Sequence, residues 1–322
     1  MKTKLTEMFG IKYPIIQGGM QNLGIPKFAS AVSNAGGMGT INIASFPGVE
    51  AFRDAVKEMN DLTDKPYFVN ISLVPNLNRG DEIFRYIDVC AEGGVKAIET
   101  AGASPDPYIK AIKDAGIKLC HKTPTVRHAV RMEQKGADMI TIAGYEVAGH
   151  PSEEAVGTFV LLNKTAQSLS IPVLAAGGIA DGRGLAAALA MGAEGVVMGT
   201  RFAASLECPM HQNFKDLLVA SQENQTVLIQ KSIHNMARVL GTDASRKCLE
   251  MEAKGATLEE LMTVIAGKIT KKCYETGDTA NSIFAVGPAV GLIHDIKSVK
   301  DIIEDIVAEA EAALDQARSV FA

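Results

Sequence analysis

The stretch Pro172-Val-Leu-Ala-Ala-Gly-Gly-Ile-Ala-Asp-Gly-Arg-Gly184 decides the fold. It begins as a short apolar run and ends in a glycine-rich turn. The same succession returns at once in Gly195-Val-Val-Met-Gly-Thr-Arg-Phe202. Short, continuous apolar runs are typical of parallel strands that are covered on both faces. The two segments therefore indicate two successive strand–helix units.

The same unit repeats upstream through the first two-thirds of the chain. Amphipathic segments of helical period, such as 107–115 and 126–135, separate the apolar runs. The expected strands are Tyr13–Gln17, Met38–Ile43, Tyr67–Leu73, Ala97–Ala101, Lys118–Lys122, Met139–Ala143, Pro172–Ala176 and Gly195–Gly199. Eight such units predict an α/β protein with a (β/α)8 TIM barrel. An open doubly wound sheet is the alternative, but it would need fewer parallel strands and a topological switch point.

The pattern changes after the eighth predicted strand. Residues 213–284 show several helical segments and no clear strand, so we expect a helical insertion or cap there. The barrel then comprises residues 1–212 and 285–322. Its last helix is predicted to begin near Ser298, where Ser298-Val-Lys-Asp301 fits a capping box with Asp in place of Glu. One apolar stripe follows on that helix, made of Ile302, Ile303, Ile306, Val307, Ala310 and Leu314.

Composition narrows the classes of partner. The 322 residues carry a net charge of −5, which gives no reason to expect nucleic acid or an anionic membrane surface. The five cysteines form no CxxC pair, so the sequence indicates no disulfide framework and no metal site. Without a secretory leader or a run long enough to span a bilayer, the chain is expected to be cytoplasmic, with no membrane insertion. We expect a small-molecule substrate and leave a homodimer open.

Glycines stand at the ends of the seventh and eighth predicted strands. Gly177 and Gly178 occupy the same place in one unit that Gly199 and Thr200 occupy in the next. In this architecture the loops after strands seven and eight are the usual phosphate cradle, because main-chain N–H groups can approach an anion there. The alternative is that these glycines only allow tight turns. Their equivalent positions in consecutive units favour a phosphate site.

A set of motifs, in order along almost the whole chain, resembles a known family. They are Gln17-Gly-Gly-Met-Gln21, Glu99-Thr-Ala-Gly102, His121-Lys122, Glu146-Val-Ala-Gly-His150, Ala176-Gly-Gly-Ile-Ala-Asp-Gly-Arg-Gly184, Met198-Gly-Thr-Arg-Phe202 and Glu207-Cys-Pro-Met-His211. Together they resemble the nitronate monooxygenase (2-nitropropane dioxygenase-like) family of FMN barrels. Flavin-dependent enoyl-ACP reductases share the Gly-Gly-Ile-Ala-Asp-Gly-Arg-Gly segment.

Within that family, Ala148-Gly-His-Pro151 resembles the branch that acts as an NADH:quinone reductase. Nitronate monooxygenases typically have Glu-Ala-Gly-Gly-His-Arg-Gly at this place, so the difference disfavours nitronate oxidation. The resemblance implies FMN as cofactor and NAD(P)H as co-substrate. The positions that it assigns to FMN are Gly18, Gly19, Met20, Ser72, Lys122, Ala148, Gly149, Gly177, Gly178, Gly199 and Thr200.

These positions divide by their expected partner on FMN. Gly177, Gly178, Gly199 and Thr200 would hold the phosphate, and the residues from Gly18 to Met20 would lie against the isoalloxazine ring. A lysine at position 122 would stabilise the anionic reduced flavin by direct charge. The alternative for Lys122 is an ordinary solvated lysine at a strand end.

His150 is the candidate catalytic residue, because it follows the sixth predicted strand on a flexible loop. Imidazole titrates near neutrality, so it could take the α-proton of a nitroalkane as a general base. It could instead orient or protonate an enoyl acceptor, or donate a hydrogen bond to a quinone oxygen as charge builds there. Glu99 and Glu146 are candidates to orient it, with a structural or solvated role as the alternative.

The sequence thus predicts an FMN-dependent oxidoreductase that takes hydride from NAD(P)H and reduces a quinone or a related conjugated acceptor. Two flavin alternatives stay open: a nitronate monooxygenase that uses O2, and an enoyl reductase. A non-redox barrel that binds a phosphate ester is a further alternative. The glycine run also resembles the IMP dehydrogenase family, but the segment after the sixth strand carries His150 and no thiol.

Overall fold

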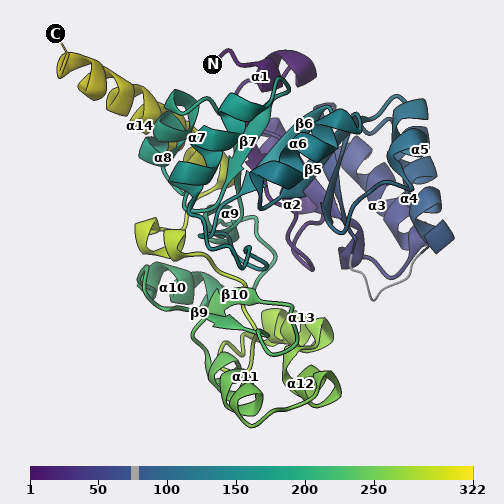
Figure 1. The fold of residues 1–322 in the computed structure, drawn as a ribbon, viewed down its shortest axis with the longest axis vertical. Coiled ribbons are helices and arrows are strands. Elements are labelled where there is room, and N and C mark those ends of the chain that lie inside the picture. Colours follow the sequence, from purple (N-terminus) through teal and green to yellow (C-terminus); the bar gives the residue numbers. More distant parts are fainter. Residues whose placement is uncertain (74–79, 322) are drawn as a thin grey trace.

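The computed structural model describes residues 1–73 and 80–321 and confirms the predicted barrel (Figure 1). Its parallel strands are β1 (Ile15–Gln17), β2 (Gly39–Asn42), β3 (Tyr67–Leu73), β4 (Ala97–Gly102), β5 (Lys118–Thr123), β6 (Met139–Ala143), β7 (Val173–Ala176) and β8 (Gly195–Met198). Each strand pairs with the next along the chain from β2 to β8, and β8 pairs with β1. A bridge between Ile16 and Met38 joins β1 to β2, so the ring is nearly closed.

Helices surround the ring. They are α1 (Lys4–Phe9), α2 (Pro26–Asn34), α3 (Val49–Leu62), α4 (Gly80–Glu92), α5 (Ile109–Asp114), α6 (Val126–Gln134), α7 (Thr158–Ser168), α8 (Gly182–Ala190), α9 (Thr200–Ala203) and α14 (Val299–Ser319), with a 3-10 turn η1 (Ile43–Ser45) after β2. The helices between the strands pack their apolar faces against the outer face of the sheet, and α14 packs against α8. Helix α1 instead contributes Leu5 to the cluster inside the barrel. All five cysteines are free and buried.

The barrel interior is filled by a buried cluster with side chains from every strand except β2, beside which Met38 contributes from the preceding residue. This cluster includes Phe68, Cys120, Met139, Leu174 and Val197. Because successive side chains on a strand point to opposite faces, residues two positions further along also face the axis, closer to the carboxyl ends. The residues of the buried cluster are apolar, whereas those two positions further along are mostly polar side chains or glycine. The open end of the barrel therefore lies at the carboxyl ends of the strands.

The segment between α9 and the end of the barrel differs from the prediction. It contains α10 (Gln212–Ala220), α11 (Asp243–Ala253), α12 (Leu258–Ile265) and α13 (Gly267–Thr276), followed by a 3-10 turn η2 (Pro288–Leu292). It also contains an antiparallel pair, β9 (Thr226–Ile229) and β10 (Ala237–Leu240). The expectation of no strand was wrong, because strands of four residues are too short for their alternation to be read.

This insertion, residues 212–277, has a small core of its own. Ile229, Val239, Cys248 and Leu261 are buried together, so the hairpin and helices α11 and α12 support one another. Helix α10 instead contributes Phe214 to the main core of the barrel. The insertion, which lies below the barrel in Figure 1, is therefore joined to it through packed side chains.

Helix α14 confirms most of its predicted stripe. The Ser298 hydroxyl accepts the main-chain N–H of Asp301 at 3.1 Å, as an N-cap does. The Asp301 carboxylate accepts the serine hydroxyl instead of completing a capping box. The stripe is buried as far as Ala310, but Leu314 is 42% exposed, because the last turns of α14 extend beyond the barrel (Figure 1). Among the described residues, no helix combines the length and the apolar character that crossing a bilayer requires.

Candidate active site

One half of the open end consists of bare main chain. Gly177 and Gly178 have φ angles of +99° and +75°, a region that L side chains rarely adopt. A Cβ atom at Gly177 would stand 3.0 Å from the main-chain nitrogen of Val147. In the described part of the chain, the N–H groups of Gly178, Gly199 and Thr200 have no hydrogen-bond acceptor. These donors at neighbouring strand ends can receive an anion such as a phosphate.

The turn after β1 lies against this glycine half. Gly18 donates its N–H to the carbonyl of Met198 at 2.8 Å, which ties the end of β1 to β8. The sulfur of Met20 lies 3.8 Å from the place where a Cβ of Gly199 would be. Gly19 is required for packing, because a Cβ there would overlap the side chain of Asn70. The turn therefore connects the glycine half to the strands on the other side.

The other half carries a network of buried polar side chains. The Glu99 carboxylate accepts hydrogen bonds from Asn70 Nδ2 at 2.7 Å, from Lys122 Nζ at 2.9 Å and from Thr141 Oγ1 at 3.1 Å. Asn42 continues the network by donating Nδ2 to Asn70 Oδ1 at 3.1 Å. A buried carboxylate with three donors is fully satisfied. Lys122 is thus half of a cation–carboxylate pair in the barrel and not a lysine in open water.

Two further polar side chains border this network. The Ser72 hydroxyl is exposed and donates to Asn70 Oδ1 at 3.2 Å. Gln17 is fully buried, and its Oε1 accepts the main-chain N–H of Thr40 at 3.3 Å. Its Nε2 has no partner among the described residues. A buried amide without a partner is costly and marks a place where a ligand acceptor can be received.

These donors suit a flavin mononucleotide. The bare N–H groups of the glycine half match an anionic phosphate, and Lys122 Nζ is a donor of the kind that binds the polar edge of an isoalloxazine ring. A cradle that a Cβ would fill and an unsatisfied buried donor are both features of a site built for a ligand. In the described residues, no group of three or more metal-ligating side chains is present.

The loop that carries His150 leads from β6 to α7. Glu146, on this loop, accepts the main-chain N–H and the hydroxyl of Thr158, each at 2.8 Å. Thr158 is the first residue of α7, so Glu146 caps that helix, where a negative charge is favourable. Gly149 has a φ angle of +73°, which turns the chain just before the histidine. Glu146 is therefore a structural acid that fixes both ends of the loop.

The insertion holds the same loop from the other side. Gly149 and Arg238 of β10 form an antiparallel bridge, with Gly149 N donating to Arg238 O at 3.0 Å. The Arg238 guanidinium donates to the carbonyl of Tyr145 at 3.2 Å and to Thr226 Oγ1 at 3.0 Å. It also lies over the Tyr145 ring, 4.9 Å from the centroid. Arg238 is 8% exposed and pairs with no acid in the described residues. Its Nη atoms bond to Tyr145 and Thr226, whereas its buried Nε has no partner there.

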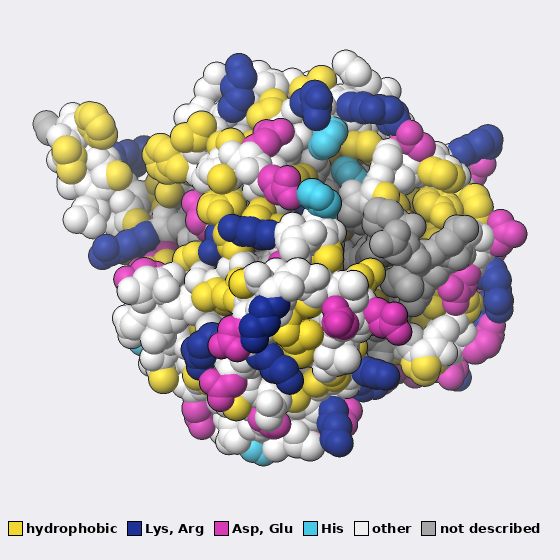
Figure 2. Space-filling model, turned by 60° about the horizontal axis from the view of Figure 1, so that its bottom comes forward, with side chains coloured by type: hydrophobic (Ala, Val, Ile, Leu, Met, Phe, Trp, Pro, Cys, Tyr) yellow, Lys and Arg dark blue, Asp and Glu magenta, His cyan; other side chains and the backbone are white. Residues whose placement is uncertain are grey.

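His150 stands exposed at the end of this supported loop. Its imidazole makes no hydrogen bond to any described residue, and neither Glu99 nor Glu146 bonds to it. The protein around it lowers its pKa by desolvation, so the ring is neutral at physiological pH. A side chain that is exposed to solvent but partly desolvated by the protein around it lies in a concave part of the surface. Figure 2 shows two histidine side chains, in cyan, close to each other on the face of the molecule in view.

His121 and Lys122 are neighbours in sequence but face opposite sides of β5. Lys122 reaches Glu99 in the barrel interior, whereas His121 Nδ1 lies 2.9 Å from Thr100 Oγ1. Burial lowers the pKa of His121 to about 4. His121 is thus a neutral, structural histidine, and of this motif only Lys122 belongs to the open end.

Sequence reasoning missed several members of the site. Asn70 could have been found from the sequence, because it lies two positions before the predicted site residue Ser72 on the same strand and so faces the same side. Thr141 could have been found as a polar residue within a predicted buried strand. Arg238 and Gly287 carry no local signal. Gly287 donates its N–H to Thr200 Oγ1 at 3.3 Å, and a Cβ there would meet the carbonyl oxygen of Glu146 at 2.6 Å. Such contacts join segments far apart in sequence.

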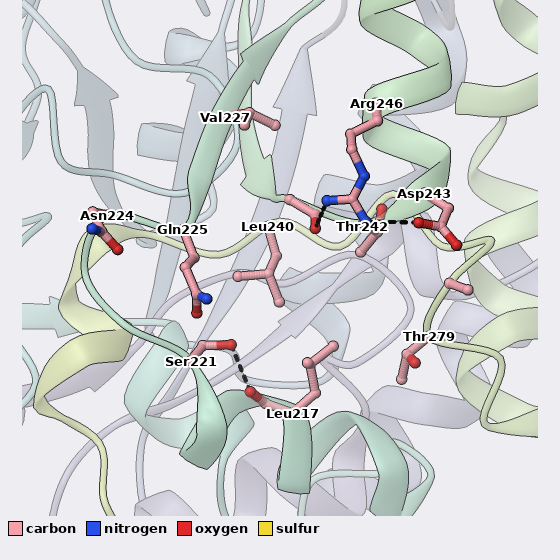
Figure 3. A pocket seen from close by; sticks show the side chains of 12 residues that line it. Leu217, Ser221, Asn224, Gln225, Val227, Leu240, Thr242, Asp243, Arg246 and Thr279 are labelled. Atoms are coloured by element: carbon pink, nitrogen blue, oxygen red, sulfur yellow. Dashed lines mark hydrogen bonds and ion pairs between the residues drawn. The ribbon is translucent and has the colours of Figure 1, made fainter.

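A pocket in the insertion lies apart from the open end. It measures about 440 Å³ and is lined by residues of α10, β9, β10 and α11 (Figure 3). Arg246 on its wall donates to Asp243 and to the carbonyl of Gly241, so this cation is already paired within the wall. No residue of the predicted site lines this pocket.

Comparison with known proteins agrees with this architecture. The family model of nitronate monooxygenase matches residues 2–309. A carboxyl-CoA dehydrogenase from Rhodococcus jostii, whose substrate is a hydroxy-methyl-oxo-octahydroindene thioester, is 31% identical over 98% of this chain and 97% of its own. A probable nitronate monooxygenase from Staphylococcus saprophyticus is 32% identical over 78% of this chain and 82% of its own.

A solved structure, FabK from Thermotoga maritima, is 39% identical and superposes with a TM-score of 0.92, covering 99% of each chain. The match therefore includes the insertion as well as the barrel. Because the family model spans nearly the whole sequence, the chain belongs to the nitronate monooxygenase family, a family of flavin-dependent oxidoreductases.

Proposed function

We propose that this protein is an FMN-dependent reductase that takes hydride from NAD(P)H and delivers it to a conjugated carbonyl acceptor, with an α,β-unsaturated thioester as the substrate class. One observation carries the proposal. The open end combines bare N–H donors on one half, a buried cation on the other half and a neutral imidazole on a supported loop beside them. That set can bind an anionic cofactor and stabilise negative charge on an acceptor.

The residues divide the work as follows. The N–H groups of Gly178, Gly199 and Thr200 bind the phosphate, and Lys122 places its ammonium near the ring edge. When bound, FMN supplies hydride transfer between the nicotinamide and the acceptor. His150, neutral at working pH, donates an N–H to the carbonyl oxygen of the acceptor, where negative charge builds as hydride arrives at the β-carbon. The enolate that results takes a proton from water at its α-carbon, which completes the reduction. The bridge from Gly149 to Arg238 keeps the imidazole in place for this bond.

The thioester class is supported by two of the relatives that match along the full length. FabK is an enoyl reductase, and the Rhodococcus protein is named for a coenzyme A thioester. Both cover this chain almost completely. A thioester carbonyl and a quinone oxygen demand the same donor. The Ala148-Gly-His-Pro151 motif favours a quinone as the second candidate acceptor.

The experiment uses purified protein as it exists in solution. We expect a yellow protein from which FMN is released on denaturation and whose flavin is bleached by anaerobic NADH or NADPH. Crotonyl-CoA, added next, should restore the colour. Restoration by 1,4-benzoquinone alone would assign a quinone reductase instead.

Two outcomes would contradict the proposal as a whole. A flavin that is inert to both nicotinamides, but supports oxygen uptake with propionate 3-nitronate, would identify a nitronate monooxygenase. A colourless protein that binds no FMN on titration would leave the phosphate-ester barrel as the better description.

A further inference from the structure

We propose that Glu99 is a positioning residue that holds the Lys122 ammonium and weakens its positive field at the flavin, and so lowers the reduction potential of the bound cofactor. The inference rests on the proposed function, because it requires FMN at the open end. It concerns a side chain that has no role in binding phosphate or substrate.

Depth in the barrel sets the order of the two charges. Glu99 pairs with Cys120 across β4 and β5, whereas Lys122 pairs with Ala101, two residues closer to the open end. The Glu99 side chain is 6% exposed and that of Lys122 is 25% exposed, with Nζ and Oε2 2.9 Å apart. The ammonium is therefore the outer charge and the carboxylate the inner one.

The carboxylate is fixed by donors on the neighbouring strand β3 and on β6, which lies two strands away. Asn70 on β3 bonds to Oε2, Thr141 on β6 bonds to Oε1, and Asn42 in turn holds Asn70. These are side chains of rigid strands, so Glu99 cannot turn away when a cofactor arrives. In this described network, Glu99 and Lys122 are the only charged members, and their charges oppose each other.

The sign of the effect follows from the charge that a flavin gains on reduction. A positive charge near its polar edge favours the reduced, anionic form, and a nearby negative charge disfavours it. Glu99 partly cancels Lys122 and thereby keeps the flavin a stronger reductant. A carbon–carbon double bond is harder to reduce than a quinone, so this arrangement suits the proposed acceptor class.

The test compares charge removal with loss of a hydrogen bond. Sulfite, an anion that adds to oxidised flavins, binds more tightly as the field around the flavin becomes more positive. Glu99→Gln keeps the shape and should tighten sulfite binding by about tenfold, and should raise the midpoint potential in dye-equilibration titrations. Thr141→Val, which removes one bond to Glu99 and no charge, should change sulfite binding by less than about twofold. Lys122→Met should weaken it.

A second variant keeps the test informative if Glu99→Gln folds poorly. Glu99→Asp keeps the charge but draws the carboxylate back from Nζ, so its sulfite affinity should lie between those of wild type and Glu99→Gln. If both variants bind FMN and bind sulfite as the wild type does, the inference is wrong and the proposed function stands. If the wild type binds no FMN, both are wrong.

Discussion

The ends of β7 and β8 present main-chain N–H groups and hardly any side chain, whereas β3 to β6 end in a bonded network around Glu99. Bare amides have a fixed direction and no charge to titrate, so they hold a constant anion well. Bonded side chains can tune charge at the place where electrons arrive. Under the proposed function, one half of the open end serves binding and the other half serves chemistry.

The largest effect on FMN binding is expected from a bulky side chain placed in the glycine half. Gly178→Val places a branched side chain where the donors must meet the phosphate, and should weaken FMN binding by about a hundredfold or more, as loss of two charge-assisted bonds implies. The measurement is an FMN titration of the apoprotein. Gly116→Val is the matched control, because Gly116 also has a positive φ, +71°, but lies far from the rim at the turn before β5. Equal FMN affinity in both variants would remove the glycine half from the site.

His150→Ala, at the seam between the halves, should separate binding from turnover. We expect FMN content and flavin reduction by NADH to stay near wild type, while reoxidation by the acceptor slows about a hundredfold, as for removal of an oxyanion donor. Stopped-flow measurement of the two half-reactions checks this. His128→Ala is the control, because His128 is exposed on α6. Reoxidation at the wild-type rate would exclude a role for the imidazole.

Arg238→Met tests whether the insertion supports the histidine loop. Methionine keeps most of the packing but loses the bond to Tyr145 and the contact with its ring, so we expect about 2 kcal/mol lower stability and an acceptor half-reaction slower by about tenfold, with FMN affinity unchanged. Urea unfolding and stopped-flow spectroscopy measure the two effects. Arg246→Met, on an exposed side chain of the same insertion, should leave the half-reaction alone. A similar slowing in both variants would point to a general loosening of the insertion.

The smallest effect concerns the outer face of the polar half. His121 has a pKa of about 4 in the native state, below its pKa of about 6.5 in the unfolded state. Between these two values the unfolded state binds a proton and the native state does not, so lower pH favours unfolding. The free energy of unfolding should therefore fall by about 2 kcal/mol between about pH 7.5 and pH 5 on this account alone. His121→Gln should remove that part of the slope in urea unfolding. Identical slopes in the two proteins would show that His121 does not titrate in this way.

Much of the barrel follows from local pattern. The eight apolar runs and the position of Gly177 and Gly178 directly after the seventh strand were predicted, because each depends on residues close together in sequence. The hairpin of β9 and β10 was missed because four-residue strands carry too little alternation. Within the candidate site, the positions on strand ends could be named, whereas Arg238 could not, since its partners Tyr145 and Gly149 lie some ninety residues upstream. The roles assigned to the site residues stay predictions.

The bridge between Gly149 and Arg238 also constrains how family members can exchange parts. A chimera that takes the β6–α7 loop from one relative and the hairpin from another would lose a pair of main-chain hydrogen bonds. It would also leave a buried guanidinium without its acceptor on the loop. Segments 144–150 and 226–240 should therefore be transplanted as one unit, and substrate preference is expected to move with the pair and not with either piece.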